Sequence, residues 1–193
     1  MNSWDNFKKT YKQSNKKNWI KEIYTDDSLS EDESLEFGEL SEDICLCISD
    51  ALKKKKFTLV LNKKETSYDY KNNIIYWNIS KSKDVIITEF LHELGHVVEH
   101  QNPEILNWSL AFVCDRSGKN IDDIKQETSI KNNVWFSGNF IEPYVGKVYK
   151  TDATEIISMG FQYLYNNKEV FKQKDEYHYL MIDFILKNGT LPK

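Results

Sequence analysis

The pentapeptide His92-Glu93-Leu94-Gly95-His96 is an HExxH motif, and it restricts the fold and chemistry of this chain more than any other feature. On an α-helix, residues four positions apart lie on one face, one turn above each other. His92 and His96 can therefore direct two imidazole nitrogens at a single Zn²⁺ ion, with Glu93 beside them as a base for a water molecule. The motif predicts a zinc site on a helix.

The segment that carries the motif has the pattern of a buried helix. Asp84 is a suitable N-cap, and the residues from there to about His100 are apolar on nearly every side. Because a metal site needs a dry and shaped cavity, burial of this helix favours a zinc site. The alternative, an HExxH that occurs by chance on an ordinary core helix, remains open.

The size and charge of the chain exclude several classes of protein. With 193 residues and a formal net charge of −4, it is long enough for one domain and has no overall basic field for nucleic acid. Its 3 cysteines are too few for a disulfide framework, and no stretch is apolar enough for a membrane span. The N-terminus lacks a signal-peptide pattern, so we expect a cytoplasmic protein in the producing cell, or one that is delivered or virion-associated without such a signal.

Charged residues are unevenly distributed over the first part of the chain, which is basic and then acidic. Three aromatic residues recur at helical spacing and predict a short N-terminal helix: Trp4, Phe7 and Tyr11. Residues 25–40 have the composition of an acidic linker. We therefore divide the chain into a charged arm over residues 1–40, either solvated or bound to a partner, and a single domain over residues 41–193 that opens with a helix at Ser41.

The domain is predicted to be α+β, with a small mixed sheet before the HExxH helix and a mostly helical part after it. Residues 57–61 are typical of a strand. Residues 67–70 and 74–79 flank a turn sequence and predict a hairpin.

Three further helices are expected in the second half of the chain. One begins at Pro103 and ends near Gly118, and the last covers residues 175–187. Between them, residues 118–150 are predicted to be rich in loops. The remaining helix begins after them, with Thr151 or Asp152 as its cap.

A tetrahedral zinc ion held by two histidines needs a third protein ligand. His100 is too distant, because it lies about 12 Å beyond His92 along the helix axis. Glu155 fits best by context, since it belongs to a polar stripe on an otherwise apolar helix, although a solvated face explains this stripe equally well. The other members of the stripe are Asp152, Ser158 and Gln162.

Other side chains remain candidates for the third ligand. Glu142, Asp122, Asp123 and Glu127 lie in the loop-rich segment, where a ligand is held less rigidly. His178 lies on the last expected helix and is better explained as an ordinary core or surface histidine. The residues alone leave the choice open.

Three segments together resemble a known family. The HExxH motif is followed by YVGKVY at residues 144–149 and by TEIISMG at residues 154–160. This combination is similar to the zincin-type metallopeptidase domain of phage head-morphogenesis proteins and bacterial polymorphic toxins, over roughly residues 57–166. The resemblance implies that Glu155 is the third zinc ligand, as in gluzincins, and that Ser158 supports the ligands from one turn away.

The resemblance also implies a zincin-like fold and a substrate cleft. In zincins an edge strand beside the HExxH helix lines the cleft and pairs with extended substrate. By this analogy we expect residues 74–79 to form that strand. The expected substrate is a protein or peptide, and the expected protein is a toxin, an effector or a phage-associated protease.

The chemistry expected of these residues is zinc-dependent hydrolysis of peptide bonds. One Zn²⁺ ion per chain would be held by the two motif histidines and Glu155, and Glu93 would act as general base. Tyr149 is the first choice, and Tyr144 the second, for a hydroxyl that stabilises the oxyanion. Each tyrosine is equally well explained as a packed aromatic residue.

Two other classes of function remain open. A zincin-fold module can keep its metal without turnover, or act only in protein interaction. Glu93 argues against this class, because a purely structural zinc does not need a carboxylate between its histidines. A nucleic-acid-binding accessory protein, built on the basic part of the arm, is disfavoured by the net acidity of the chain.

Overall fold

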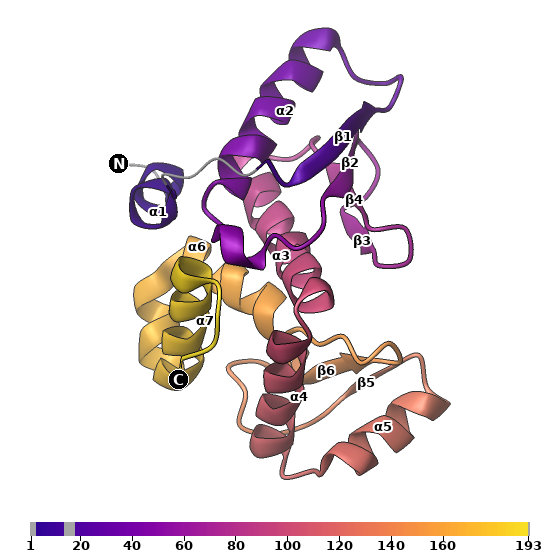
Figure 1. Cartoon of the computed structure of the whole chain (residues 1–193), viewed down its shortest axis with the longest axis vertical. Helices are drawn as coiled ribbons and strands as arrows, with labels where there is room; N and C mark the ends of the chain where they lie inside the picture. Colours follow the sequence, from indigo (N-terminus) through magenta and orange to yellow (C-terminus); the bar gives the residue numbers. More distant parts are fainter. Residues whose placement is uncertain (1–2, 14–17, 193) are drawn as a thin grey trace.

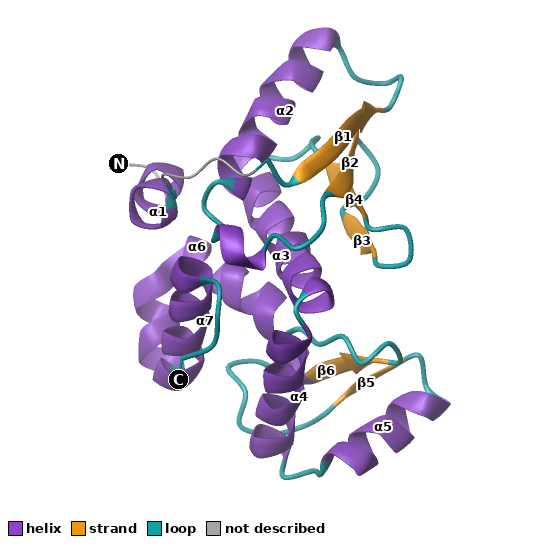
Figure 2. Ribbon diagram, in the orientation of Figure 1, coloured by secondary structure: helices purple, strands orange, loops and turns teal. Residues whose placement is uncertain are grey.

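A buried helix, α3 (Lys83–Gln101), runs through the centre of the protein, between the main sheet on one side and the C-terminal helices on the other (Figure 1). The structure is a computed structural model that describes residues 3–13 and 18–192. It is α+β, as expected, with helices as the dominant element (Figure 2). The predicted HExxH helix is confirmed, but it begins after Ser82 as N-cap rather than after Asp84. Asp84 instead accepts hydrogen bonds from the hydroxyls of Ser3 and Tyr165.

The main sheet has four strands in the order β1-β2-β4-β3. β1 (Ile20–Thr25), β2 (Phe57–Asn62) and β4 (Ile74–Asn78) are parallel, and β3 (Ser67–Asp69) is antiparallel to β4. The predicted strand and hairpin are therefore confirmed. The expectation that residues 74–79 form the edge strand is wrong, because β4 has a neighbour on both sides and β3 occupies the edge.

Aromatic packing joins this sheet to α3. Trp77 of β4 stacks on Phe90 of α3, with ring centroids 4.5 Å apart, and both side chains are fully buried. The indole nitrogen of Trp77 donates a 2.8 Å hydrogen bond to the carbonyl oxygen of Ile86, so its polar atom is satisfied in the core. These contacts fix the sheet against the helix that carries the motif.

The segment predicted as a charged arm contributes regular elements to the fold. α1 (Ser3–Tyr11) buries the three aromatic residues that predicted it, and β1 belongs to the main sheet. The acidic stretch is not a linker, because α2 (Glu31–Cys45) begins well before Ser41. Ser30 and Glu33 form a capping box, in which each side chain accepts a hydrogen bond from the other residue's backbone N–H.

The segment predicted to be rich in loops contains a helix and two strands. After α4 (Pro103–Ser117), which matches the expected helix, α5 (Ile121–Ile130) is capped by the side chain of Asn120. β5 (Asn133–Trp135) and β6 (Lys147–Tyr149) then pair antiparallel. Apolar side chains of these elements form a second hydrophobic cluster, separate from the main core.

The C-terminal part is helical, as predicted. α6 (Ile156–Lys174) begins four residues later than Asp152, which has a left-handed backbone with φ of 65°. α7 (Glu176–Asn188) ends at Gly189 in the left-handed conformation. α6 divides its side chains between the two cores: Ile157 lies in the main cluster and Ile156 in the second.

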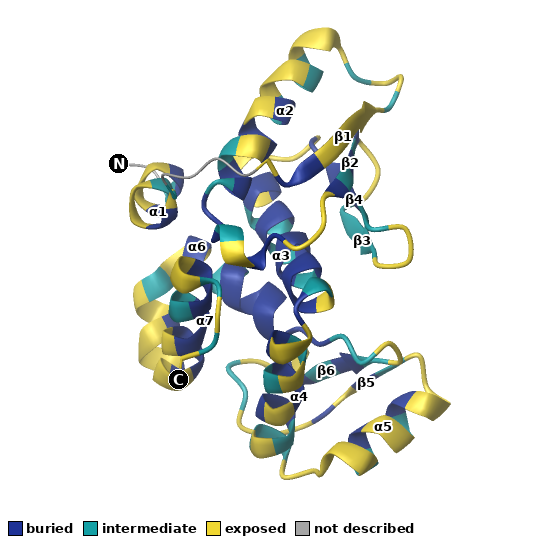
Figure 3. Ribbon diagram, in the orientation of Figure 1, coloured by how far each residue is buried: buried dark blue, intermediate teal, exposed yellow. Residues whose placement is uncertain are grey.

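Burial is greatest along α3 and the first turns of α6, whereas the outer faces of α2 and α5 are exposed (Figure 3). The three cysteines are free. Over residues 3–13 and 18–192, no helix combines the length and the apolar character needed to cross a bilayer.

Candidate metal centre

His92, His96 and Glu155 converge at the point where α3 meets the start of α6. The Nε2 atoms of His92 and His96 lie 3.3 and 3.4 Å from the same carboxylate oxygen of Glu155, Oε2. One potential ligand atom from each residue lies within 4.8 Å of the other two. The structure thus brings together the three residues that sequence and resemblance pointed to.

The donor set fits a zinc ion. Ligand atoms held about 2.0–2.1 Å from a tetrahedral zinc ion lie about 3.3–3.4 Å from each other. The two distances from Glu155 to the imidazoles have this length. Two imidazoles and one carboxylate also leave a fourth position open, which is the arrangement of catalytic rather than structural zinc sites.

Glu155 is held from several sides. Its side chain is fully buried, and Oε1 accepts a 2.5 Å hydrogen bond from the Tyr149 hydroxyl. Oε2 accepts a 2.7 Å bond from the hydroxyl of Ser158. Burial works to raise the pKa of this carboxyl, but hydrogen bonds from the two imidazoles outweigh it and hold the pKa far below its ordinary value.

The charge state of His96 complements that of Glu155. Burial works to lower the pKa of the His96 imidazole, but the adjacent carboxylate outweighs it and raises the pKa above its ordinary value. In the metal-free protein the two side chains therefore form a buried ion pair. A cation bound between them replaces the proton as the partner of the carboxylate.

Two contacts position the segment that carries Glu155. The carboxylate of Glu99, one turn beyond His96 on α3, accepts hydrogen bonds from the backbone N–H of Thr154 at 2.7 Å and from its hydroxyl at 2.6 Å. Thr154 immediately precedes Glu155. The face of α3 that packs against α6 thus supplies two candidate ligands, and through Glu99 it also anchors the loop that precedes Glu155.

The tight loop between β6 and α6 brings Tyr149 close to Glu155. The N–H of Tyr149 donates a 2.8 Å hydrogen bond to the carbonyl oxygen of Ala153, and Val148 forms a β-bridge with Thr154. The backbone therefore turns back on itself between β6 and α6. As a result Tyr149 and Glu155, six residues apart in the sequence, lie side by side.

Glu93 lies beside the candidate ligands and lines the same cleft. Its side chain is nearly buried, and desolvation raises its pKa, although the two nearby imidazoles partly offset this effect. A carboxylate with a raised pKa is a better proton acceptor than an exposed one. Glu93 thus lies beside the candidate ligands in a desolvated position, and its role as a base stays a prediction.

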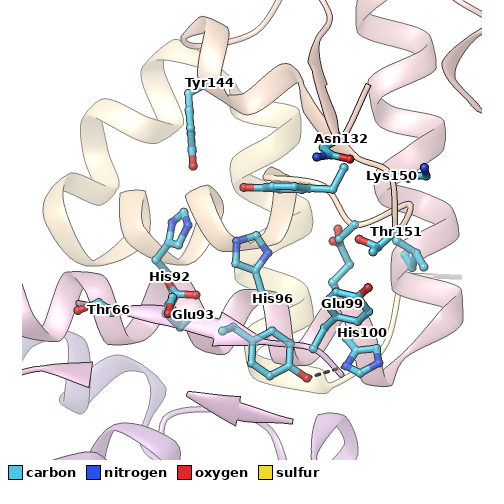
Figure 4. Close-up of a pocket in the computed structure, with 16 residues that line it drawn as sticks. Thr66, His92, Glu93, His96, Glu99, His100, Asn132, Tyr144, Lys150 and Thr151 are labelled. Carbon is cyan, nitrogen blue, oxygen red and sulfur yellow. Dashed lines mark hydrogen bonds between the residues drawn. The ribbon is translucent and has the colours of Figure 1, made fainter. Parts of the chain in front are cut away.

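The cleft in front of the site has a volume of about 750 Å³. Figure 4 shows the imidazoles of His92 and His96 pointing the same way, while Tyr144 approaches from the opposite side. Residues of the β3 edge form another wall, where the hydroxyl of Tyr68 lies 2.6 Å from Nδ1 of His100. The cleft is therefore bounded by an unpaired strand edge and by tyrosine hydroxyls.

The other candidate ligands lie outside the cluster. His100 contacts Tyr68 instead, and His178 is fully buried, with Nε2 3.0 Å from the carbonyl oxygen of Ile156. Four carboxylates are also absent from the only metal-ligating group found among the described residues: Asp122, Asp123, Glu127 and Glu142. Glu127 forms an ion pair with Lys119.

Two residues near the site were not singled out from the sequence. Glu99 was part of an apolar helix pattern, and nothing local relates it to Thr154. Lys147 was part of the YVGKVY segment, and its Nζ atom lies 3.7 Å from Oε1 of Glu155. An acidic residue on a buried helix, and a lysine between two tyrosines, are the signals that could have marked them.

Comparison of this chain with protein-family models, with curated proteins and with solved structures finds no match. The geometry of the site and its chemistry are therefore the basis for the functional proposal that follows.

Proposed function

We propose that the protein is a zinc-dependent peptidase with a gluzincin-like site. The observation that carries the proposal is the convergence of two imidazoles and one buried carboxylate beside Glu93, next to a cleft that His92, Glu93 and His96 line. His92, His96 and Glu155 would hold one Zn²⁺ ion per chain. The zincin-like fold and the relation to phage and toxin domains belong to the same proposal and rest on the sequence resemblance.

The residues of the site have distinct tasks in this proposal. When bound, a zinc ion supplies a Lewis acid that activates water at neutral pH and polarises a carbonyl group. Glu93 accepts the proton of the attacking water and delivers it to the leaving amine. The hydroxyl of Tyr144, on the opposite wall, donates a hydrogen bond to the substrate oxygen as negative charge develops there.

A protein or peptide in extended conformation is the substrate that best suits the cleft. The β3 edge lines one wall, and the backbone groups of an edge strand can pair with an added strand. A substrate strand paired to this edge runs along the cleft, so we propose internal cleavage rather than removal of single terminal residues.

A non-catalytic metal-binding or protein-interaction module is the second candidate. Glu93 speaks against it, because a carboxylate kept in a buried position at a cost in desolvation contributes nothing to a structural zinc site.

The experiment that separates the two candidates uses purified zinc-loaded protein and a Glu93→Gln variant. Each is incubated with an unfolded proteome extract, and new peptide N-termini are identified by mass spectrometry. We expect new termini with the parent protein and none with the variant, at equal zinc content. Equal sets of termini from both would exclude Glu93 as the base, and an absence of termini from both would favour the non-catalytic module.

A further inference from the structure

We propose that Lys147 is a positioning residue for the metal centre, acting through Tyr149 to select the oxygen of Glu155 that faces the metal. The proposal rests on the proposed metal site and adds a device that the HExxH motif does not contain. It assigns a task to the lysine of the YVGKVY segment.

Lys147 lies in an aromatic cage next to the site. Its Nζ atom lies 4.3 Å from the ring centroid of Tyr149, 4.8 Å from that of Tyr144 and 5.3 Å from that of Trp135. Its side chain is only 11% exposed. A cation held by three ring faces and shielded from water has few alternative positions, so its hydrogen bonds are directed.

The ammonium group determines the direction of the neighbouring hydrogen bond. Nζ of Lys147 lies 2.6 Å from the hydroxyl oxygen of Tyr149, and a lysine can only donate. The Tyr149 oxygen is therefore the acceptor, and its single proton must point elsewhere. It points to Oε1 of Glu155, 2.5 Å away. These three residues thus form a hydrogen-bond chain in which Lys147 donates to Tyr149 and Tyr149 donates to Glu155.

The state of Tyr149 agrees with this chain. Burial, followed by the charge of Glu155, raises the pKa of the Tyr149 hydroxyl well above its ordinary value. This direction is the one expected for a hydroxyl that donates its proton to the carboxylate, as the positions of Lys147 and Glu155 require.

The two oxygens of Glu155 consequently have different surroundings. Oε1 is hydrogen-bonded to Tyr149 and lies 3.7 Å from Lys147, whereas Oε2 accepts a hydrogen bond from Ser158 and lies within 3.4 Å of both imidazoles. Because Oε1 is directed toward Tyr149, Oε2 is the oxygen that faces the imidazoles and a metal bound between them. Without this hydrogen-bond chain, Oε1 could also turn toward the metal. It would then occupy the coordination position that a water molecule needs.

The test compares four proteins: the parent, Lys147→Met, Tyr149→Phe and the double variant. Methionine keeps the length of the side chain and removes its donors. The readouts are the zinc dissociation constant, from competition with a chromophoric chelator, and the visible absorption of the cobalt-loaded protein, which responds to coordination number. Lys131→Met is the control, since Lys131 is exposed at the end of α5.

We expect each single variant to bind zinc about tenfold more weakly, as for loss of other groups that orient ligands. The double variant should be no weaker than either single one, because both substitutions interrupt one chain. The cobalt spectrum should change in all three, and Lys131→Met should match the parent. Should Lys147→Met fail to fold, as judged by circular dichroism, Lys147→Gln takes its place, because the glutamine amide can accept as well as donate and so no longer fixes the direction of the Tyr149 hydrogen bond.

Three outcomes would overturn the inference, and they can be distinguished from one another. Parent protein that binds zinc tightly, with unchanged affinity and spectrum in the variants, refutes the role of Lys147 and leaves the proposed function intact. Parent protein that binds no zinc refutes both. Additive losses in the double variant would also count against a single chain.

Discussion

Gly95 and Ser158 lie in backbone contact, so that a methyl group on Gly95 would meet the Cα atom of Ser158 at 2.4 Å and its nitrogen at 2.6 Å. Gly95 is the fourth residue of the HExxH motif, and Ser158 follows Glu155 by one turn. The absence of a side chain lets α3 and α6 approach closely enough for the ligands of both to meet. The second variable position of the motif is therefore structural in this protein.

We predict that Gly95→Ala destabilises the metal-free protein by about 3 kcal/mol or more, at the upper end of overpacking effects, because the atoms it meets belong to the backbone. The free energy of unfolding is measured in urea. The matched control is Gly38→Ala within α2, where the nearest atom is Ile23 Cδ1 at 3.6 Å. That variant should be more stable by about 0.5–1 kcal/mol, because alanine favours a helix. Equal effects at the two sites would contradict the close approach.

Zinc stoichiometry tests the ligand set on α3. The purified protein should contain one Zn²⁺ ion per chain, as measured by elemental mass spectrometry. His96→Ala should lose it, since Nε2 of His96 lies 3.4 Å from Glu155. His100→Ala should retain it, since His100 contacts Tyr68. Equal zinc loss from the two variants would show that the ligands have been misassigned.

The assignment of Glu155 as the third zinc ligand can be tested against a control substitution three residues away, at Asp152. Glu155→Gln should lower zinc affinity strongly, because an amide oxygen carries no charge for the ion. Asp152→Asn should leave zinc affinity unchanged, because Asp152 precedes the helix and asparagine tolerates its left-handed backbone. Calorimetric titration with zinc provides both values, and comparable losses would argue for a general effect of negative charge.

Glu99 should make stability depend on pH. Burial raises the pKa of its carboxyl from 4.5 to about 7. Between these values the folded chain holds a proton that the unfolded chain has lost, so the free energy of unfolding falls as pH rises, by at most about 3 kcal/mol.

Comparison with Glu99→Gln measures this contribution together with the coupled one of His96, because the glutamine does not titrate and the charge of Glu99 helps to raise the pKa of His96. The parent should lose stability relative to the variant between pH 4.5 and 7, with no further relative change above that range. Urea unfolding of metal-free protein at several pH values provides the measurement. A constant difference across the range would rule out a raised pKa for Glu99.

Substitution of Tyr149 should affect zinc affinity, whereas substitution of Tyr144 should affect the rate of catalysis. Because the proton of Tyr149 is committed to Glu155, we expect Tyr149→Phe to weaken zinc binding. Burial raises the pKa of Tyr144 to about 12, so its hydroxyl stays protonated and faces the cleft. Tyr144→Phe should therefore lower kcat on a peptide substrate at unchanged zinc affinity. The reverse pattern would return the oxyanion role to Tyr149.

The parts of the fold that were predicted are those determined by local pattern. The HExxH helix, the hairpin of β3 and β4, and the helix that ends at Gly118 all carry their signals within a few residues. α2 was missed although Ser30 and Glu33 form a capping box, because the acidic composition of the following residues was given more weight. The sequence does not predict α5, because its ten residues lie in a segment whose glycines and prolines are typical of loops.

The parts of the site that were not predicted depend on contacts between distant segments. Nothing near Glu99 in the sequence indicates that it anchors Thr154, 55 residues away. The placement of Lys147 inside an aromatic cage likewise requires β5, β6 and the turn between them. Glu155 was reached only because a resemblance supplied the pairing, since its polar stripe allowed a solvated face equally well.

The division of α6 between two hydrophobic clusters gives the metal centre a second use, as a reporter of assembly. His92 and His96 are carried by a helix of the main core, whereas Glu155 immediately precedes Ile156 of the second one. Only molecules in which both cores have formed and docked can present all three donors together. The fraction of molecules that retain a metal ion during refolding, or in truncated and mutated chains, therefore measures how many have docked the second hydrophobic cluster onto the main core. This measurement does not depend on whether any substrate is cleaved.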